Sequence, residues 1–257
     1  MKDDLAAKDP GSVLRQWTSA RVAIGRVGAS LPTGAHLEFT RDHALARDAV
    51  HLPLDVDALA DGLRSQGFPS IRITSRAADR SEYLRRPDLG RRLHADFVAI
   101  VQDKGAVQRL TVVIADGLSA QAPARHAVPL LLQLRELLVD WTMDDVVIAT
   151  QARVALADEV GALRGAEATL ILIGERPGLK SPDSLGAYLT YGPRVGRTDA
   201  ERNCVSNIRP EGLTYDVAAH RLAHLLRRAR ELAGSGTMLK DDSDAPQRIS
   251  ATSSPTE

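Results

Sequence analysis

Glu175 has the sequence setting that most favours a binding role. It lies in the string GERPG at residues 174–178, directly after an apolar run that predicts a buried strand. Glycines in such a loop let the backbone approach a ligand closely, and the carboxylate can accept hydrogen bonds from amides. The alternative is an internal ion pair between Glu175 and Arg176 that caps the turn. We interpret the string as a candidate binding loop.

Two more loops follow predicted strands and are expected beside this one. Asp116 and Gly117 end one apolar run, and Arg153 and Val154 follow another. Ligands of open α/β sheets bind outside the carboxyl ends of the strands, at a topological switch point. The side chain of Asp116 could contact a ligand there, or it could cap the helix that follows.

Cys204, in the string ERNCVSNIRP at residues 201–210, is the only cysteine of the chain. A lone cysteine is more often a buried small apolar residue than a reactive thiol, and no base lies next to it in sequence. Its neighbours Val205 and Ile208 are apolar, which predicts a raised pKa and a neutral thiol. We therefore expect Cys204 to make a packing contact and not to act as a nucleophile.

The stretch at residues 75–92, SRAADRSEYLRRPDLGRR, is dense in arginine and aspartate. It is consistent with a solvated, self-paired surface. It is equally consistent with a partner interface or an anion contact, because arginine and tyrosine are enriched at interface hot spots. The string GRVGASLP at residues 25–32 lacks the G-x-G-x-x-G spacing and follows no apolar strand, which favours a turn over a phosphate loop.

Several classes of protein are disfavoured by what the sequence lacks. It contains no Walker loop, dinucleotide fingerprint, G-x-S-x-G or H-E-x-x-H motif, so we predict neither a catalytic residue nor a metal ligand in this chain. The 33 basic and 33 acidic residues balance, which argues against binding nucleic acid through a bulk positive field. The longest apolar runs are far shorter than the roughly 20 residues of a membrane span. We expect no membrane partner and an intracellular protein.

Hydrophobic periodicity predicts an α/β protein, with a mainly helical N-terminal segment followed by a Rossmann-like open α/β sheet domain. We expect a disordered N-terminus at residues 1–16, the helical region at 17–104, the sheet domain at 105–234 and a disordered tail at 235–257. In the first part, helices are predicted at 31–51, 55–67 and 85–105, with an edge strand at 70–77. In the second part, strands are predicted at 110–119, 145–154, 168–178 and 185–193, and helices at 123–141, 155–165 and 214–234.

Seven strings, taken in order, resemble one family, the small subunit of ethanolamine ammonia-lyase, over about residues 17–234. They are ARVAIGRVGASLPT (20–33), HALARDAVH (43–51), SRAADRSEYLRRPDLGRRL (75–93), VVIADGLSA (112–120), ILIGERPGL (171–179), SLGAYLTYGPR (184–194) and RNCVSNIRPEGL (202–213). The combination of DRxEYLxRPDxGRRL with GERPGL is specific, because both are long and rarely arise by chance.

The resemblance implies a lyase that uses adenosylcobalamin, a cobalt cofactor, to convert ethanolamine to acetaldehyde and ammonia. It implies a large catalytic subunit as partner, a hetero-oligomer of six large and six small subunits, and the cofactor between the two kinds of subunit. Residues 105–234 would be the cobalamin-contacting domain, with Val154, Glu175 and Cys204 at the positions that match cofactor contacts of the family. The motif D-x-H-x-x-G is absent, which implies that no histidine of this chain ligates cobalt.

The same resemblance implies a cytoplasmic location, with the interior of a bacterial microcompartment as the narrower alternative. Two other classes of function stay open from the residues alone. One is a stand-alone α/β enzyme that binds a nucleotide or a phosphate, and the other is a scaffold module without a ligand.

Overall fold

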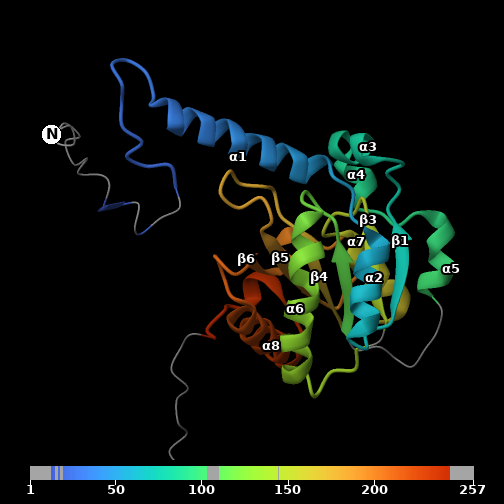
Figure 1. Cartoon of the computed structure of the whole chain (residues 1–257). Helices are drawn as coiled ribbons and strands as arrows, with labels where there is room; N and C mark the ends of the chain where they lie inside the picture. Colours follow the sequence, from blue (N-terminus) through green and yellow to red (C-terminus); the bar gives the residue numbers. More distant parts are fainter. Residues whose placement is uncertain (1–12, 15–16, 18–19, 103–109, 144, 244–257) are drawn as a thin grey trace, which may run out of the picture.

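A six-stranded sheet forms the centre of the structure, a computed structural model that describes residues 13–14, 17, 20–102, 110–143 and 145–243. The strands are ordered β1-β3-β2-β4-β5-β6 (Figure 1). Most of the predicted disordered N-terminus and the end of the predicted tail, from residue 244, lie outside the described residues.

Four neighbouring strands of the sheet are parallel, and the two strands at the other edge join it through antiparallel pairings. The parallel strands are β1 (Ser70–Thr74), β2 (Leu110–Ala115), β3 (Val146–Thr150) and β4 (Ala168–Gly174). Strand β5 (Leu185–Tyr191) runs antiparallel to β4, and β6 (Asn203–Ile208) runs antiparallel to β5. The expected open α/β sheet is confirmed, and β1 is an edge strand as predicted. Strand β6, which carries Cys204, was not predicted from the sequence.

Helices cover both faces of the sheet because its inner strands are apolar on both faces. On one face, Val112 and Ile114 of β2 pack in a core with α2 (Val56–Ser65), α6 (Gln121–Leu137) and α8 (Tyr215–Leu232). On the other, Val113 and Ala115 pack in a second core with α7 (Leu156–Arg164) and α5 (Val98–Val101). This alternation is the period of two that a strand imposes on its side chains. The sheet takes strands from both sides of residue 105, because β1 pairs with β3.

The helix predicted at residues 85–105 is wrong as a single element. The chain forms α3 (Arg80–Arg85), α4 (Pro87–Gly90), a 3-10 turn η2 (Ala95–Phe97) and then α5. Between α4 and η2, Leu93 forms a β-bridge with Ser75 and donates its backbone N–H to Glu159 at 2.9 Å. These contacts with distant residues draw the backbone out of a helical path.

Helix α1 (Thr33–His51) projects from the body of the molecule (Figure 1). Only Asp42 and Ala49 are buried among its 19 residues. Lys180, from the β4–β5 connection, pairs with Asp42 at 3.1 Å and also with Glu38. At the other end of the helix, Arg80 donates to the carbonyl of Val50 at 2.6 Å. Helix α1 is thus tied to the carboxyl edge of the sheet while most of its surface is exposed.

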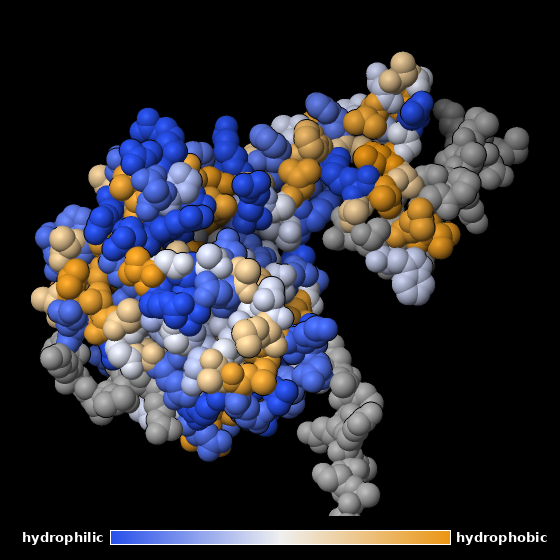
Figure 2. All heavy atoms as spheres, turned by 180° about the vertical axis from the view of Figure 1, so that it is seen from behind, coloured by the Kyte–Doolittle hydropathy of each residue, from blue (hydrophilic) through white to orange (hydrophobic). Residues whose placement is uncertain are grey.

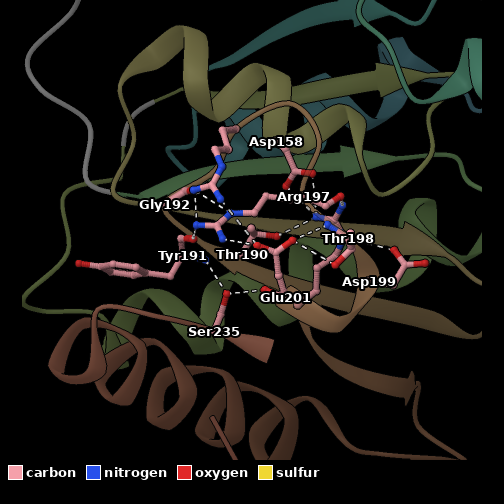
Figure 3. A network of polar contacts seen from close by, with 11 residues as sticks. Asp158, Thr190, Tyr191, Gly192, Arg197, Thr198, Asp199, Glu201 and Ser235 are labelled. Carbon is pink, nitrogen blue, oxygen red and sulfur yellow. Dashed lines mark hydrogen bonds and ion pairs between the residues drawn. The ribbon is translucent and has the colours of Figure 1, made fainter. Parts of the chain in front are cut away.

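A network of polar contacts holds the connection between β5 and β6 (Figure 3). Asp158 of α7 is 1% exposed and pairs with Arg202 at 2.7 Å. Arg197 pairs with Glu201 and donates to the carbonyl of Tyr191 at 3.0 Å. The network joins α7 to the last two strands.

The chain after α8 is anchored up to residue 243, so the disorder predicted from residue 235 is wrong for its first part. Ser235 donates to the carbonyl of Glu201 at 2.6 Å, and the side chain of Asn203 contacts the backbone of Gly236 and Leu239. Leu239 is 3% exposed. The polar composition of this segment concealed these side-chain anchors. Within the described part of the chain, no helix combines the length and hydropathy needed to span a bilayer.

Candidate functional site

A cavity of about 440 Å³ opens at the carboxyl ends of β2, β3 and β4. The chain leaves β2 toward β3 and leaves β4 toward β5, on opposite sides, so the carboxyl ends of β2 and β4 flank a topological switch point. Val154 and Glu175, which the sequence analysis expected on neighbouring loops, both line this cavity. Arg153, Arg176 and Tyr83 line it with them.

Two glycines let the loops after β2 and β4 pack directly against each other. A Cβ atom on Gly117, whose φ is +55°, would lie 2.2 Å from the carbonyl oxygen of Gly174. A Cβ atom on Gly174 would lie 2.0 Å from the carbonyl oxygen of Ser119. The Ser119 hydroxyl also donates to the carbonyl of Pro182 at 2.7 Å. No other residue type fits at either glycine, so the cavity has a closely packed floor.

Glu175 is half-buried and tied to two other segments. Its Oε2 accepts the hydroxyl of Ser184 and, at 3.3 Å, the backbone N–H of Asn207. Its Oε1 lies 2.8 Å from the place where a Cβ atom on Gly186 would be. In the described part of the chain no ion pair joins Glu175 to Arg176, so the predicted alternative of a Glu–Arg cap is wrong. The carboxylate does brace the β4–β5 connection against β6.

Asp116 neither caps α6 nor lines the cavity, which corrects both expectations for this residue. It is 3% exposed, and its carboxylate accepts the backbone N–H groups of Gln151 at 2.9 Å and Ala152 at 3.1 Å. Burial raises the pKa of Asp116, against the opposing effects of Arg80 and these N–H groups. Asp116 therefore acts on the loop that carries Val154.

Tyr83 is a site residue that the sequence analysis did not single out. Tyr83 is fully buried, and its hydroxyl donates to the carbonyl of Ala152 at 3.1 Å. The guanidinium groups of Arg80 and Arg153 lie 4.7 and 4.3 Å from the centre of its ring. The only sequence signal was its place in the block at residues 75–92. Part of that block is the self-paired surface, since Arg86 and Asp88 form an exposed ion pair.

Cys204 lies one strand away from the cavity and is exposed, so it is not a core thiol. It pairs with Tyr188 of β5, and Tyr188 lines the cavity. The protein atoms that displace water around its sulfur raise the pKa of the thiol, which is therefore neutral at pH 7. Cys204 lines a second hollow of about 440 Å³ with Asn207 and Arg221. The structure brings Val154 and Glu175 together and places Cys204 beside them.

The cavity is suited to binding rather than to proton or acyl transfer. It presents two guanidinium groups, one carboxylate, two phenol rings and the apolar side chains of Val154, Leu118 and Ile173. Its wall contains no pair of nucleophile and base. Among the residues that the structure describes, no group of three or more His, Cys, Asp or Glu side chains could hold a metal ion. A ligand with apolar faces, amides and an anionic group matches this lining.

The fold is an open α/β sheet with a candidate binding cavity at its topological switch point. The model of the family described as "Ethanolamine ammonia-lyase light chain (EutC)" matches residues 8–240. An ethanolamine ammonia-lyase small subunit from Azotobacter vinelandii is 52% identical over 97% of this chain and 95% of its own length. One from Pseudomonas aeruginosa strain UCBPP-PA14 is 53% identical over 94% of this chain and 90% of its own length. One from Ralstonia nicotianae is 50% identical over 95% of this chain and 94% of its own length. The chain belongs to the ethanolamine ammonia-lyase light chain family.

Proposed function

We propose that the chain is the small subunit of an adenosylcobalamin-dependent ethanolamine ammonia-lyase and forms one wall of the cofactor site at the interface with the large subunit. The reaction converts ethanolamine to acetaldehyde and ammonia. The observation that carries the proposal is the single cavity lined by Val154 and Glu175, at the edge of the sheet where ligands bind. Family membership over residues 8–240 supports the assignment of the reaction.

The residues around the cavity fit the chemistry of the cofactor. A corrin ring offers an apolar rim and amide side arms, and its nucleotide carries a phosphodiester. Val154 and Leu118 can pack on the rim, Glu175 can accept from an amide, and Arg153 and Arg176 can donate to the anion. The Nε of Arg153 is buried and has no hydrogen-bond partner among the described residues.

The size of the cavity favours a shared site. Cavities of roughly 300–1,000 Å³ hold drug-sized ligands, and this cavity is about 440 Å³. Adenosylcobalamin is much larger, so this chain would cover one part of it and the large subunit the rest. When bound, the cofactor would supply the radical chemistry of its cobalt–carbon bond. The residues of this chain bind it, orient it and exclude water from its side.

The test is cobalamin binding by the purified complex of large and small subunits. After addition of cobalamin and desalting, the absorption spectrum should show retained cofactor. Glu175→Ala should weaken binding by about 5- to 150-fold, the effect of roughly 1–3 kcal/mol for a polar group that loses its partner. Gly186→Ala is a second variant with the same expected direction, because its Cβ would lie 2.8 Å from Oε1 of Glu175.

Glu136→Ala is the matched control, since this glutamate is exposed on α6 near the opposite edge of the sheet. It should leave the affinity for cobalamin unchanged. If Glu175→Ala lowers the melting temperature while affinity stays unchanged, Glu175 is only a brace for the β4–β5 connection. If the wild-type complex retains no cobalamin, the proposed function is wrong.

A further inference from the structure

The segment at residues 151–154, between β3 and α7, has a backbone that must be held in place. Gln151 has a φ of +55°, a left-handed conformation that residues other than glycine rarely adopt. The segment then supplies Arg153 and Val154 to the wall of the cavity. A non-glycine residue keeps such a conformation only when its surroundings fix it.

Four hydrogen bonds from three other segments fix this backbone. The carboxylate of Asp116, at the end of β2, accepts the N–H groups of Gln151 at 2.9 Å and Ala152 at 3.1 Å. The Tyr83 hydroxyl of α3 donates to the carbonyl of Ala152 at 3.1 Å. The carbonyl of Gly90 in α4 accepts the N–H of Arg153 at 2.8 Å. Residues far away in sequence thus satisfy four backbone polar groups of this segment.

Packing adds to these hydrogen bonds. A Cβ atom on Gly90 would lie 3.0 Å both from Cγ of Arg153 and from the ring of Tyr83. The guanidinium of Arg153 stacks over that ring, and Arg80 lies 3.4 Å from the carboxylate of Asp116. The block at residues 75–92 therefore builds the support of the cavity wall, a role that neither alternative for this block in the sequence analysis included.

We propose that Asp116 and Tyr83 are positioning residues, which hold residues 151–154 in the conformation that forms the cavity wall and thereby set the affinity for cobalamin. The proposal rests on the proposed function. Asp116 does not line the cavity, so its effect on a ligand passes through the backbone of the segment. Replacing it should change the binding of the cofactor more than the chemistry that follows.

The experiment uses the complex of large and small subunits and the variant Asp116→Asn. An amide in place of the carboxylate leaves only one oxygen for the two N–H groups. We expect the dissociation constant for cobalamin to rise by roughly 5- to 150-fold, the apparent KM for the cofactor to rise with it, and kcat at saturating cofactor to stay within about twofold. Amide hydrogen exchange at residues 151–154 should become faster.

Asp158→Asn is the matched control, because Asp158 is another buried carboxylate, 1% exposed, that pairs with Arg202 at 2.7 Å and contacts Thr190 of β5. It should lower the melting temperature and leave the affinity for cobalamin unchanged. Tyr83→Phe removes one hydrogen bond to the segment and keeps the ring, so it tests the proposal even if Asp116→Asn does not fold. We expect it to weaken cobalamin binding by about 3- to 10-fold, close to the net effect of one hydrogen bond.

The outcomes separate this proposal from the one on which it rests. A wild-type complex that binds no cobalamin contradicts the proposed function and this inference together. A wild-type complex that binds, with Asp116→Asn and Tyr83→Phe that bind equally well, overturns only the positioning role. Equal losses of affinity in Asp116→Asn and Asp158→Asn also overturn it, since the effect would then follow general stability.

Discussion

At the scale of single residues, the part of the site that follows strand ends was predictable. Glu175 and Val154 come directly after apolar runs, and parallel strands bring their carboxyl ends to one edge. Tyr83 and Asp116 were not predictable in their roles. Both act on the backbone of Ala152 from 69 and 36 positions away in sequence, and no local pattern encodes such a contact.

Cys204 lies one strand away from the cavity, and we expect its replacement to spare the reaction. The thiol has a raised pKa, so it is neutral and a poor nucleophile at pH 7. Cys204→Ser and Cys204→Ala should keep kcat at saturating cofactor and bind cobalamin a few-fold less tightly, because either change reduces the apolar contact.

The measurement is turnover by the complex at saturating cofactor, together with the dissociation constant of cobalamin. A loss of about 10³-fold in turnover with intact binding would require a catalytic thiol, since losses of this size follow the removal of a group that acts in the transition state. Unchanged affinity in both variants would show that Cys204 lies outside the contact with the cofactor.

At the scale of elements, the strands with continuous apolar runs and the long amphipathic helices were predicted correctly, because periodicity reports them directly. The strand β6 was missed because only Val205 and Ile208 of its six residues are buried, which breaks the alternation of a typical strand. The order and direction of β5 and β6 depend on pairing between distant segments, which a local pattern does not contain.

Helices α6 and α8 meet at a buried histidine that should make stability depend on pH. His126 is 4% exposed, its Nδ1 lies 2.8 Å from the Tyr215 hydroxyl, and its Nε2 lies 3.5 Å from the Asp183 carboxylate. Burial lowers the pKa of His126, against the raising effect of Asp183, while Arg125 lowers it and Glu211 raises it. The imidazole of His126 is therefore mainly neutral in the folded protein at pH 7.

The direction of the effect follows from which state binds the proton. The unfolded chain has a histidine pKa of about 6.5 and the folded state a lower one, so below pH 6.5 the unfolded state takes up a proton first. The free energy of unfolding should fall as the pH drops from about 6.5, by at most about 1.4 kcal/mol per pH unit from this group. His126→Gln should flatten that slope in urea unfolding at pH 5.5 and 7.5.

His220→Gln is the control for this slope, because His220 is exposed on the same helix as Tyr215. It should leave the pH dependence of unfolding as in the wild type. If His126→Gln keeps the full slope, another group titrates in this window and the buried imidazole does not control it.

At the scale of the whole molecule, the surface is unevenly apolar, and the arm formed by residues 20–52 carries much of the exposed apolar surface. Figure 2 shows orange side chains along the projecting part of the molecule. The exposed large apolar residues of the arm are Val27, Leu31, Leu37, Phe39, Leu45 and Leu52. Exposed apolar patches of this kind are typical of protein–protein contact sites. The relatives are named small subunits, so we expect a large subunit to bind this surface.

The place of the arm in the fold supports the same partner. Lys180 ties α1 to the β4–β5 connection, which also carries Glu175, and Arg80 ties the other end of α1 to the support of residues 151–154. Arm and cavity therefore lie along the carboxyl edge of the sheet. A single large subunit could cover both surfaces, which is what a cofactor site shared between subunits requires.

We expect charges on the exposed face of α1 to weaken the complex without unfolding the chain. Leu37 is 63% and Leu45 46% exposed, so Leu37→Glu combined with Leu45→Glu should change the free energy of unfolding by less than about 1 kcal/mol. Affinity for the large subunit should fall by tenfold or more, the loss of about 1.4 kcal/mol or more that buried interface residues cause.

Val139→Glu, at an 83% exposed site beyond the far end of α6, is the control and should bind normally. Sedimentation of mixed subunits measures the amount of complex and the amount of free chain, and thus the affinity. Equal affinity of the double variant and the wild type would refute the role of the arm in binding the large subunit. Normal binding of the large subunit, together with reduced self-association of the isolated chain, would assign the arm to contacts between copies of this chain.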